Sequence, residues 1–343
     1  MRNRQDSFSM NIHDPELVDS SANIRIENIN NELLLIFKEN SIYSVLTADS
    51  TDPEKLHPDT GHTYEKIATV GAASPYVARI LLQFKDIFDI VISEQKLKNN
   101  LLREIWKLNE QLLSCLYFAQ DIHSQTDEAI HKCDEIIEKN KATGLIPPLV
   151  KVRNLEDSAK SFLLTGKQVL IGCFKLISFF SSLPLNSQNE AHFDKHVKWL
   201  EQNAPELEGL STMLTNDLSW IRRLSECRNA IEHPGTGQSL TIENIKLQPG
   251  NKFSLPTWSY DISKKIGLKE SNIYIHQELE SYLHNMLHLI EEVLLICASS
   301  HLPSNGMLSL YQHKEEDIDP KCPIKYFIGL NNDFKFKTNE ISL

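Results

Sequence analysis

Apolar side chains recur every three or four residues along most of the chain, which is the spacing of helices that bury one face. Ser74 followed by Pro75 opens the first long run, as an N-cap and a first helical residue would. The runs lie at 74–95, 101–140 (as one helix or two), 155–180, 189–205, 206–233 and 272–302. A further short helix is predicted within 27–46. The pattern therefore predicts a mainly α fold, built as a helical bundle.

One segment, 239–262, departs from the helical spacing. It carries β-branched and aromatic residues on both sides of Pro249-Gly250-Asn251, which is typical of a β-hairpin around a turn. This small hairpin is expected to be the only sheet. The tail holds one further candidate strand, at 325–330.

Composition shifts and breaks divide the chain into four parts. Residues 1–28 are rich in Ser, Asn and Asp without a sustained period, and they are predicted to form a flexible arm. A helical region follows at 29–143, and the Gly-Leu-Ile-Pro-Pro sequence at 144–148 marks a soft boundary. The main helical core is placed at 144–302, with the hairpin inserted in it, and the tail at 303–343.

The composition narrows the class of protein. The 343 residues are 41% hydrophobic and 24% charged, which is ordinary for a globular chain that buries a core. The six cysteines form no C-x-x-C pair, so they are expected to be reduced thiols rather than a disulfide framework or a zinc ribbon. The first residues do not resemble a signal peptide, and Lys175 interrupts the most apolar run, at 169–185. We therefore expect a cytoplasmic protein with no membrane span, metal or cofactor.

The sequence RNAIEHP, from Arg228 to Pro234, ends the helix predicted at 206–233. On a helix, Arg228 and Glu232 share one face, and Asn229 and His233 share the neighbouring face. In the simpler interpretation, Arg228 and Glu232 form a surface ion pair and His233 is a favourable cation near the last carbonyl groups. That interpretation requires no function.

The same residues also suit phosphodiester chemistry. Pro234 disfavours helical geometry in the residue before it, so His233 is expected at a frayed helix end from which it can reach a substrate. Histidine transfers protons near neutral pH, and the planar fork of arginine matches phosphate oxygens. Cleaving RNA without a metal needs both a base and an acid, which one histidine cannot easily supply. A two-fold dimer would bring in the second histidine.

The stretch CRNAIEHPG resembles the R-x-x-x-x-H motif of the HEPN domains, in which a polar residue such as Asn often follows the arginine. The order of a buried helix, the motif helix, a hairpin and a closing helix is also similar to larger HEPN proteins. The resemblance covers about 101–302 and implies a HEPN-like helical bundle. Many HEPN proteins are metal-independent endoribonucleases of toxin–antitoxin or antiviral defence systems, and they act as homodimers.

The resemblance also implies roles for individual residues. Arg228 would contact the scissile phosphate, Asn229 would orient it, and His233 would act as acid or base. The product would carry a 2′,3′-cyclic phosphate, and the partners would be RNA, a second copy of the chain, and an antitoxin or regulatory protein. The net charge of −11 opposes general nucleic-acid binding and favours the alternative of a non-catalytic helical module that binds RNA or protein.

Other candidate residues lie near the motif or recur at a ligand-like spacing. Arg222 and Arg223 would extend a basic track for RNA, although a solvated helix surface accounts for them equally well. His192 and His196 have the i,i+4 spacing of helical metal ligands, but no third ligand follows, and a polar face is the better explanation. No dinucleotide, zinc-protease or serine-hydrolase motif is present.

Overall fold

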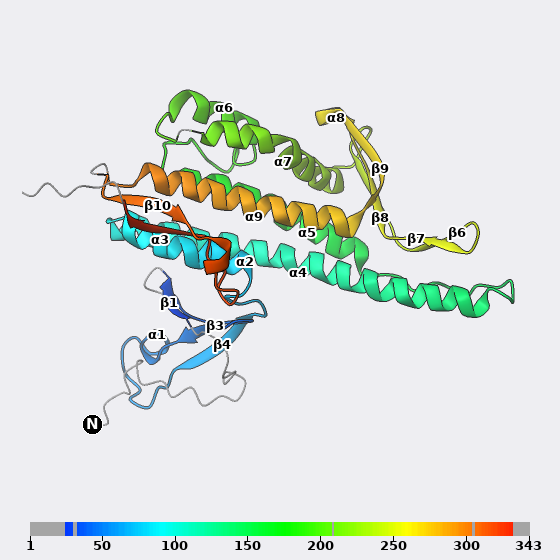
Figure 1. The fold of residues 1–343 in the computed structure, drawn as a ribbon, viewed down its shortest axis with the longest axis horizontal. Coiled ribbons are helices and arrows are strands. Elements are labelled where there is room, and N and C mark those ends of the chain that lie inside the picture. Colours follow the sequence, from blue (N-terminus) through cyan, green and yellow to red (C-terminus); the bar gives the residue numbers. More distant parts are fainter. Residues whose placement is uncertain (1–24, 30–32, 208, 304–305, 332–343) are drawn as a thin grey trace, which may run out of the picture. The chain divides into compact units, whose positions relative to one another are not determined.

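The computed structural model describes residues 25–29, 33–207, 209–303 and 306–331. It is about 52% helical and 19% strand, and the described strands form four small sheets (Figure 1). The prediction of a mainly α, HEPN-like helical bundle with a single hairpin is therefore wrong, because the fold is mixed α/β. The described strands are only three to seven residues long, and runs that short are hard to distinguish from helix by periodicity.

The chain forms two compact units. We call Met1–Asn109 with Cys297–Leu343 the terminal unit, and Glu110–Ile296 the central unit. The divisions fall inside two long helices, α4 (Gln95–Asn140) and α9 (Ile275–Ser300). The candidate motif belongs to the central unit.

An antiparallel four-stranded sheet begins the terminal unit, in the order β1-β2-β3-β4. The predicted short helix within 27–46 is wrong, because the apolar run Leu33–Phe37 pairs as a strand on both of its sides. Most of the predicted arm, 1–24, lies outside the described residues, and 25–28 belong to β1. The strands are β1 (Arg25–Ile29), β2 (Leu33–Phe37), β3 (Ile42–Leu46) and β4 (Thr63–Ala68), and the short helix α1 (Ala48–Thr51) lies between β3 and β4.

A nearly continuous helical stretch follows the sheet, as the apolar spacing predicted. It runs through α2 (Pro75–Val77), the π-helical turn η1 (Ala78–Leu82) and α3 (Gln83–Val91). Ser74 is extended at the N-cap and Pro75 is the first helical residue, which confirms the predicted start.

The chain end adds a two-stranded sheet to the terminal unit. β10 (Leu308–Gln312) and β11 (Tyr326–Leu330) pair antiparallel, with the short 3-10 helix η2 (Glu315–Asp317) between them. The strand predicted at 325–330 is thereby confirmed. The side-chain carbonyl of Gln83 accepts backbone N–H bonds from Lys325 at 2.8 Å and Tyr326 at 2.9 Å, which fastens β11 to α3.

The helices of the central unit follow the predicted runs closely. α4 is a single helix of 46 residues, and a turn with Gly144 at φ +71° follows it. Gly166 lies where α5 meets α7, and a Cβ there would lie 3.3 Å from Leu224, so this small residue permits the close approach of the two helices. The other central helices are α5 (Leu155–Ile177), α6 (Phe193–Asn203) and α7 (Leu210–Glu232).

The predicted hairpin is present at 239–262, and it is part of a larger arrangement. Its base strands are β5 (Ser239–Glu243) and β8 (Thr257–Ile262), and its tip is the small ladder of β6 (Lys246–Gln248) with β7 (Lys252–Ser254). Gly250 and Asn251 have φ values of +77° and +56°, which the turn between β6 and β7 requires.

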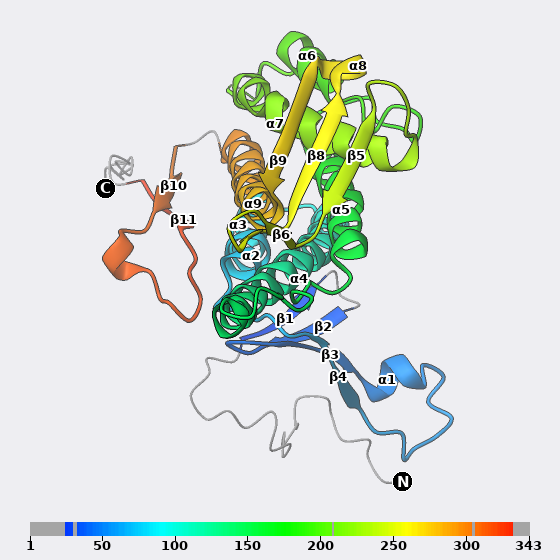
Figure 2. The same cartoon turned by 90° about the vertical axis from the view of Figure 1, so that its right-hand side faces the viewer.

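Sequence reasoning missed the third strand beside the hairpin. After the short helix α8 (Ser263–Ile266), β9 (Leu268–Tyr274) pairs with β8 and completes a sheet of order β5-β8-β9. The helix predicted from residue 272 therefore starts later, at Ile275. β5 and β8 pack on α7, so the sheet covers one side of the helix that carries the motif (Figure 2).

Candidate active site

The motif lies at the C-terminal end of α7. The backbone N–H of His233 still donates to the carbonyl of Asn229 at 2.9 Å, but its φ of −132° and ψ of 60° leave the helical region. This is the departure that a following proline favours. The His233 side chain is 75% exposed, so solvent or a ligand reaches the imidazole.

Arg228 is paired within the motif. Its Nη1 forms an ion pair with the carboxylate of Glu232 and lies 3.3 Å from the Oδ1 of Asn229. The ion pair expected in the simpler interpretation is therefore formed. The Nε of Arg228 is buried and has no hydrogen-bond partner among the described residues, so the guanidinium is not fully satisfied in this arrangement.

One carboxylate oxygen is near both the cation and the imidazole. Glu232 Oε2 is the atom that pairs with Arg228, and it is also 3.8 Å from Nε2 of His233. The guanidinium and the imidazole therefore approach the same anionic oxygen. A phosphate oxygen that bound Arg228 would compete with Glu232 for this position.

Asn229 turns towards the interior of the central unit. Its Oδ1 accepts a hydrogen bond from Nζ of Lys167 on α5 at 2.9 Å, and its Nδ2 donates to Oε1 of Glu226 at 3.2 Å. The other carboxylate oxygen of Glu226 is buried without a partner among the described residues. Their i,i+4 spacing places Asn229 and His233 on one face of α7. Asn229 nevertheless contacts Lys167 and Glu226, whereas His233 lies near Glu232.

Lys167 is the component of the site that sequence reasoning missed. The residue is only 9% exposed, although it carries an ammonium group. Burial lowers the pKa of Lys167, the nearby charge of Arg228 lowers it further, and the carboxylates of Glu226, Glu232 and Glu190 oppose the shift. Its sequence position held a signal, because it shares the apolar stripe of α5 with the buried residues Leu163, Leu170 and Phe174.

Arg222 and Arg223 do not join the motif residues in one basic track. Arg222 forms an ion pair with Asp194 on α6. Arg223 turns inward, where it lies 3.5 Å from Glu278 and 5.7 Å from the ring centroid of Tyr282, both on α9. As candidate RNA contacts, the two arginines would have to leave these partners.

The network around Glu278 joins three elements of the central unit. Glu278 is 8% exposed, accepts a hydrogen bond from Nε1 of Trp258 on β8, and accepts another from the hydroxyl of Tyr282 at 2.9 Å. Burial raises the pKa of Glu278, although these hydrogen bonds and Arg223 favour the charged form. The network fixes the sheet beside α7 and thereby supports the motif helix.

His192 and His196, which have the spacing of helical metal ligands, take part in local structure. His196 is buried, its Nε2 lies 2.8 Å from the carbonyl oxygen of Asn189, and burial lowers its pKa. His192 is the N-cap residue of α6. Within the described ranges, no three His, Cys, Asp or Glu side chains are grouped so that they could hold a metal ion.

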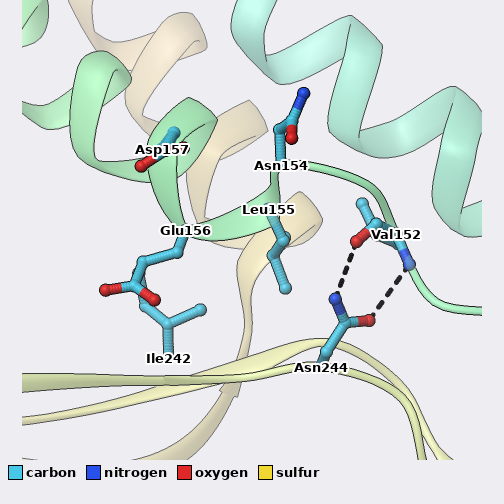
Figure 3. A pocket seen from close by; sticks show the side chains of 7 residues that line it. All are labelled: Val152, Asn154, Leu155, Glu156, Asp157, Ile242 and Asn244. Carbon is cyan, nitrogen blue, oxygen red and sulfur yellow. Dashed lines mark hydrogen bonds between the residues drawn. The ribbon is translucent and has the colours of Figure 1, made fainter.

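A pocket of about 300 Å³ lies between the start of α5 and the hairpin (Figure 3). Asn244 closes one side by hydrogen bonding to both backbone groups of Val152, at 3.1 Å and 2.7 Å. The carboxylates of Glu156 and Asp157 contribute to its lining, which does not suit a phosphate. None of the motif residues lines this pocket.

Comparison with known proteins gives no family. No family model matches the chain, and neither the curated proteins nor the solved structures contain a match. Along the described part of the chain, no helix has the length and apolarity needed to cross a bilayer.

Proposed function

We propose that this protein is a metal-independent endoribonuclease that acts as a homodimer, with Arg228, Asn229 and His233 in its active site. The observation that carries the proposal is the convergence of guanidinium and imidazole on one anionic oxygen, that of Glu232. An RNA phosphate that displaced this carboxylate would meet a charge that stabilises it and, beside it, a group that transfers protons. The similarity of RNAIEHP to the HEPN motif supports the same assignment.

The chemistry follows from these two groups. A base removes the proton of the ribose 2′-hydroxyl, whose oxygen attacks the adjacent phosphorus, and Arg228 stabilises the charge on the phosphate oxygens. The bond from phosphorus to the 5′-oxygen then breaks, and an acid protonates that oxygen. The products are a 2′,3′-cyclic phosphate and a 5′-hydroxyl. One His233 serves as base and its copy in a two-fold dimer serves as acid.

The biological setting belongs to the same proposal. RNA cleavage by an intracellular enzyme of this type suits growth arrest in toxin–antitoxin or antiviral defence, and an antitoxin or regulatory protein would then hold it in check. The cytoplasm is the corresponding location. The six cysteines fit a reducing compartment, because they form no disulfide, with five of them buried and Cys322 partly exposed.

A second candidate function has its own support. The closed ion pair of Arg228 with Glu232 and the net charge of −11 favour a non-catalytic module that binds RNA or protein. In that case Glu232 keeps Arg228 occupied, and His233 only terminates α7.

Cleavage in the presence of a chelator separates the two functions. We expect the purified full chain to cut end-labelled single-stranded RNA in EDTA, because no step of the proposed chemistry uses a metal. The fragments should carry 2′,3′-cyclic phosphate and 5′-hydroxyl ends, as measured by gel mobility before and after acid opening of the ring. Sedimentation in the same buffer should show a dimer. RNA that binds but stays intact would instead support the non-catalytic module.

A further inference from the structure

A buried lysine is an uncommon component of a helix interface, and this one reaches the candidate active site. Gly166 allows α5 and α7 to approach closely, and the next residue, Lys167, extends its Nζ to within 2.9 Å of the Oδ1 of Asn229. The same oxygen lies 3.3 Å from Nη1 of Arg228. Lys167 therefore shares the carboxamide oxygen of Asn229 with Arg228 and has the shorter contact.

Carboxylates surround the two cations of this cluster. Glu226 and Glu232 of α7 and Glu190 before α6 face the charges of Lys167 and Arg228. Without Lys167, one cation would face three carboxylates, and a phosphate would meet a more negative site. Without Lys167, Arg228 would also be the remaining donor to the carboxamide oxygen of Asn229. That hydrogen bond would then draw the guanidinium further from solvent.

We propose that Lys167 is a positioning residue of the active site, which holds the Asn229 carboxamide and offsets Glu226 so that Arg228 is available to an RNA phosphate. The proposal rests on the proposed RNA cleavage, because it assigns a role within the same site. Lys167 acts through Asn229 and Arg228, and it does not contact the reacting atoms.

Binding of an RNA that cannot be cleaved tests this role apart from catalysis. The probe is a 2′-O-methyl oligonucleotide of adenosine and cytidine, whose blocked 2′-oxygens prevent cleavage. We expect Lys167→Met to weaken binding roughly tenfold, because it removes both the charge and the hydrogen bond to Asn229. Lys167→Arg, which keeps both functions, should bind close to wild type at neutral pH. The control is Lys160→Met, which removes a lysine that pairs with Glu156 on the same helix.

The alkaline pH dependence of binding gives a readout that a purely structural role would not change. The pKa of Lys167 is lowered, so its charge is lost as the pH rises through a range below that of an ordinary lysine. Wild-type affinity should fall over that range, and Lys167→Arg should keep its affinity to higher pH, since arginine stays protonated. The charged groups facing Lys167 are Arg228, Glu226 and Glu232 of α7 and Glu190 before α6. Neither adenine nor cytosine ionises in this range.

The outcomes distinguish this proposal from the proposed function. If wild type binds the probe and Lys167→Met binds it equally well, the role of Lys167 is overturned while the ribonuclease proposal stands. If wild type binds no RNA, both fail. If Lys167→Met does not fold, as judged by thermal unfolding, the pH comparison between wild type and Lys167→Arg decides, and coincident profiles overturn the proposal.

Discussion

Replacing His233 with alanine is expected to reduce RNA cleavage by about 10²–10⁴-fold, the usual contribution of a positioned acid or base. The fold should be unaffected, because the imidazole is 75% exposed beyond the last turn of α7. Binding of uncleavable RNA should change much less than the cleavage rate. The measurement is the single-turnover cleavage rate in EDTA, at a protein concentration that saturates the RNA.

His192→Ala is the matched control for this prediction. His192 is also an exposed histidine of the central unit next to a helix end, but it lies at the N-cap of α6 and outside the motif. The control variant should cleave at the wild-type rate. An unchanged rate in His233→Ala, or an equal loss in both variants, would remove His233 from the mechanism.

Replacing Glu278 with alanine is expected to destabilise the protein by about 3 kcal/mol, the largest stability effect predicted for this chain. The change leaves the indole N–H of Trp258 and the guanidinium of Arg223 without their buried carboxylate partner. The measurement is the midpoint of urea unfolding, followed by far-ultraviolet circular dichroism. Glu280→Ala is the control, because Glu280 is exposed on the same helix, and it should shift the midpoint little.

The pH dependence of stability tests the same network. Burial raises the pKa of folded Glu278, so the unfolded chain releases this proton at lower pH than the folded chain does. The contribution of Glu278 to stability is therefore largest at acid pH and falls as the pH rises from the ordinary carboxyl range to the raised pKa. Glu278→Gln should lack this fall. Parallel stability profiles for wild type and Glu278→Gln would contradict the buried, proton-holding environment of the carboxylate.

Sequence reasoning predicted the helices of the central unit well, because their apolar stripes extend over many turns. It failed in the first sheet of the terminal unit, where Leu33–Phe37 is a continuous apolar run without a period of its own. It also missed β9, because Leu268–Tyr274 runs directly into the apolar stripe of α9. In both cases the strand is defined by its pairing partners, which lie elsewhere in the sequence.

Part of the candidate site could be predicted from the sequence. The helix end at Glu232 and the exposed position of His233 follow from Pro234 and local geometry, and the pairing of Arg228 with Glu232 follows from i,i+4 spacing. The contact of Lys167 with Asn229 joins two residues that are 62 positions apart on different helices, so local patterns could not reveal it. The inward turn of Arg223 onto Glu278 depends in the same way on tertiary packing.

The central claim, that RNA is cut through its own 2′-hydroxyl at the motif, is tested most directly by one substituted substrate. The linkage that wild type cuts fastest in an RNA is identified, and the same RNA is then made with a single 2′-deoxyribose on the 5′ side of that linkage. In EDTA, the proposed chemistry predicts that wild type no longer cuts the substituted linkage and still cuts the neighbouring ones. Cleavage at the substituted linkage at an unchanged rate would contradict it.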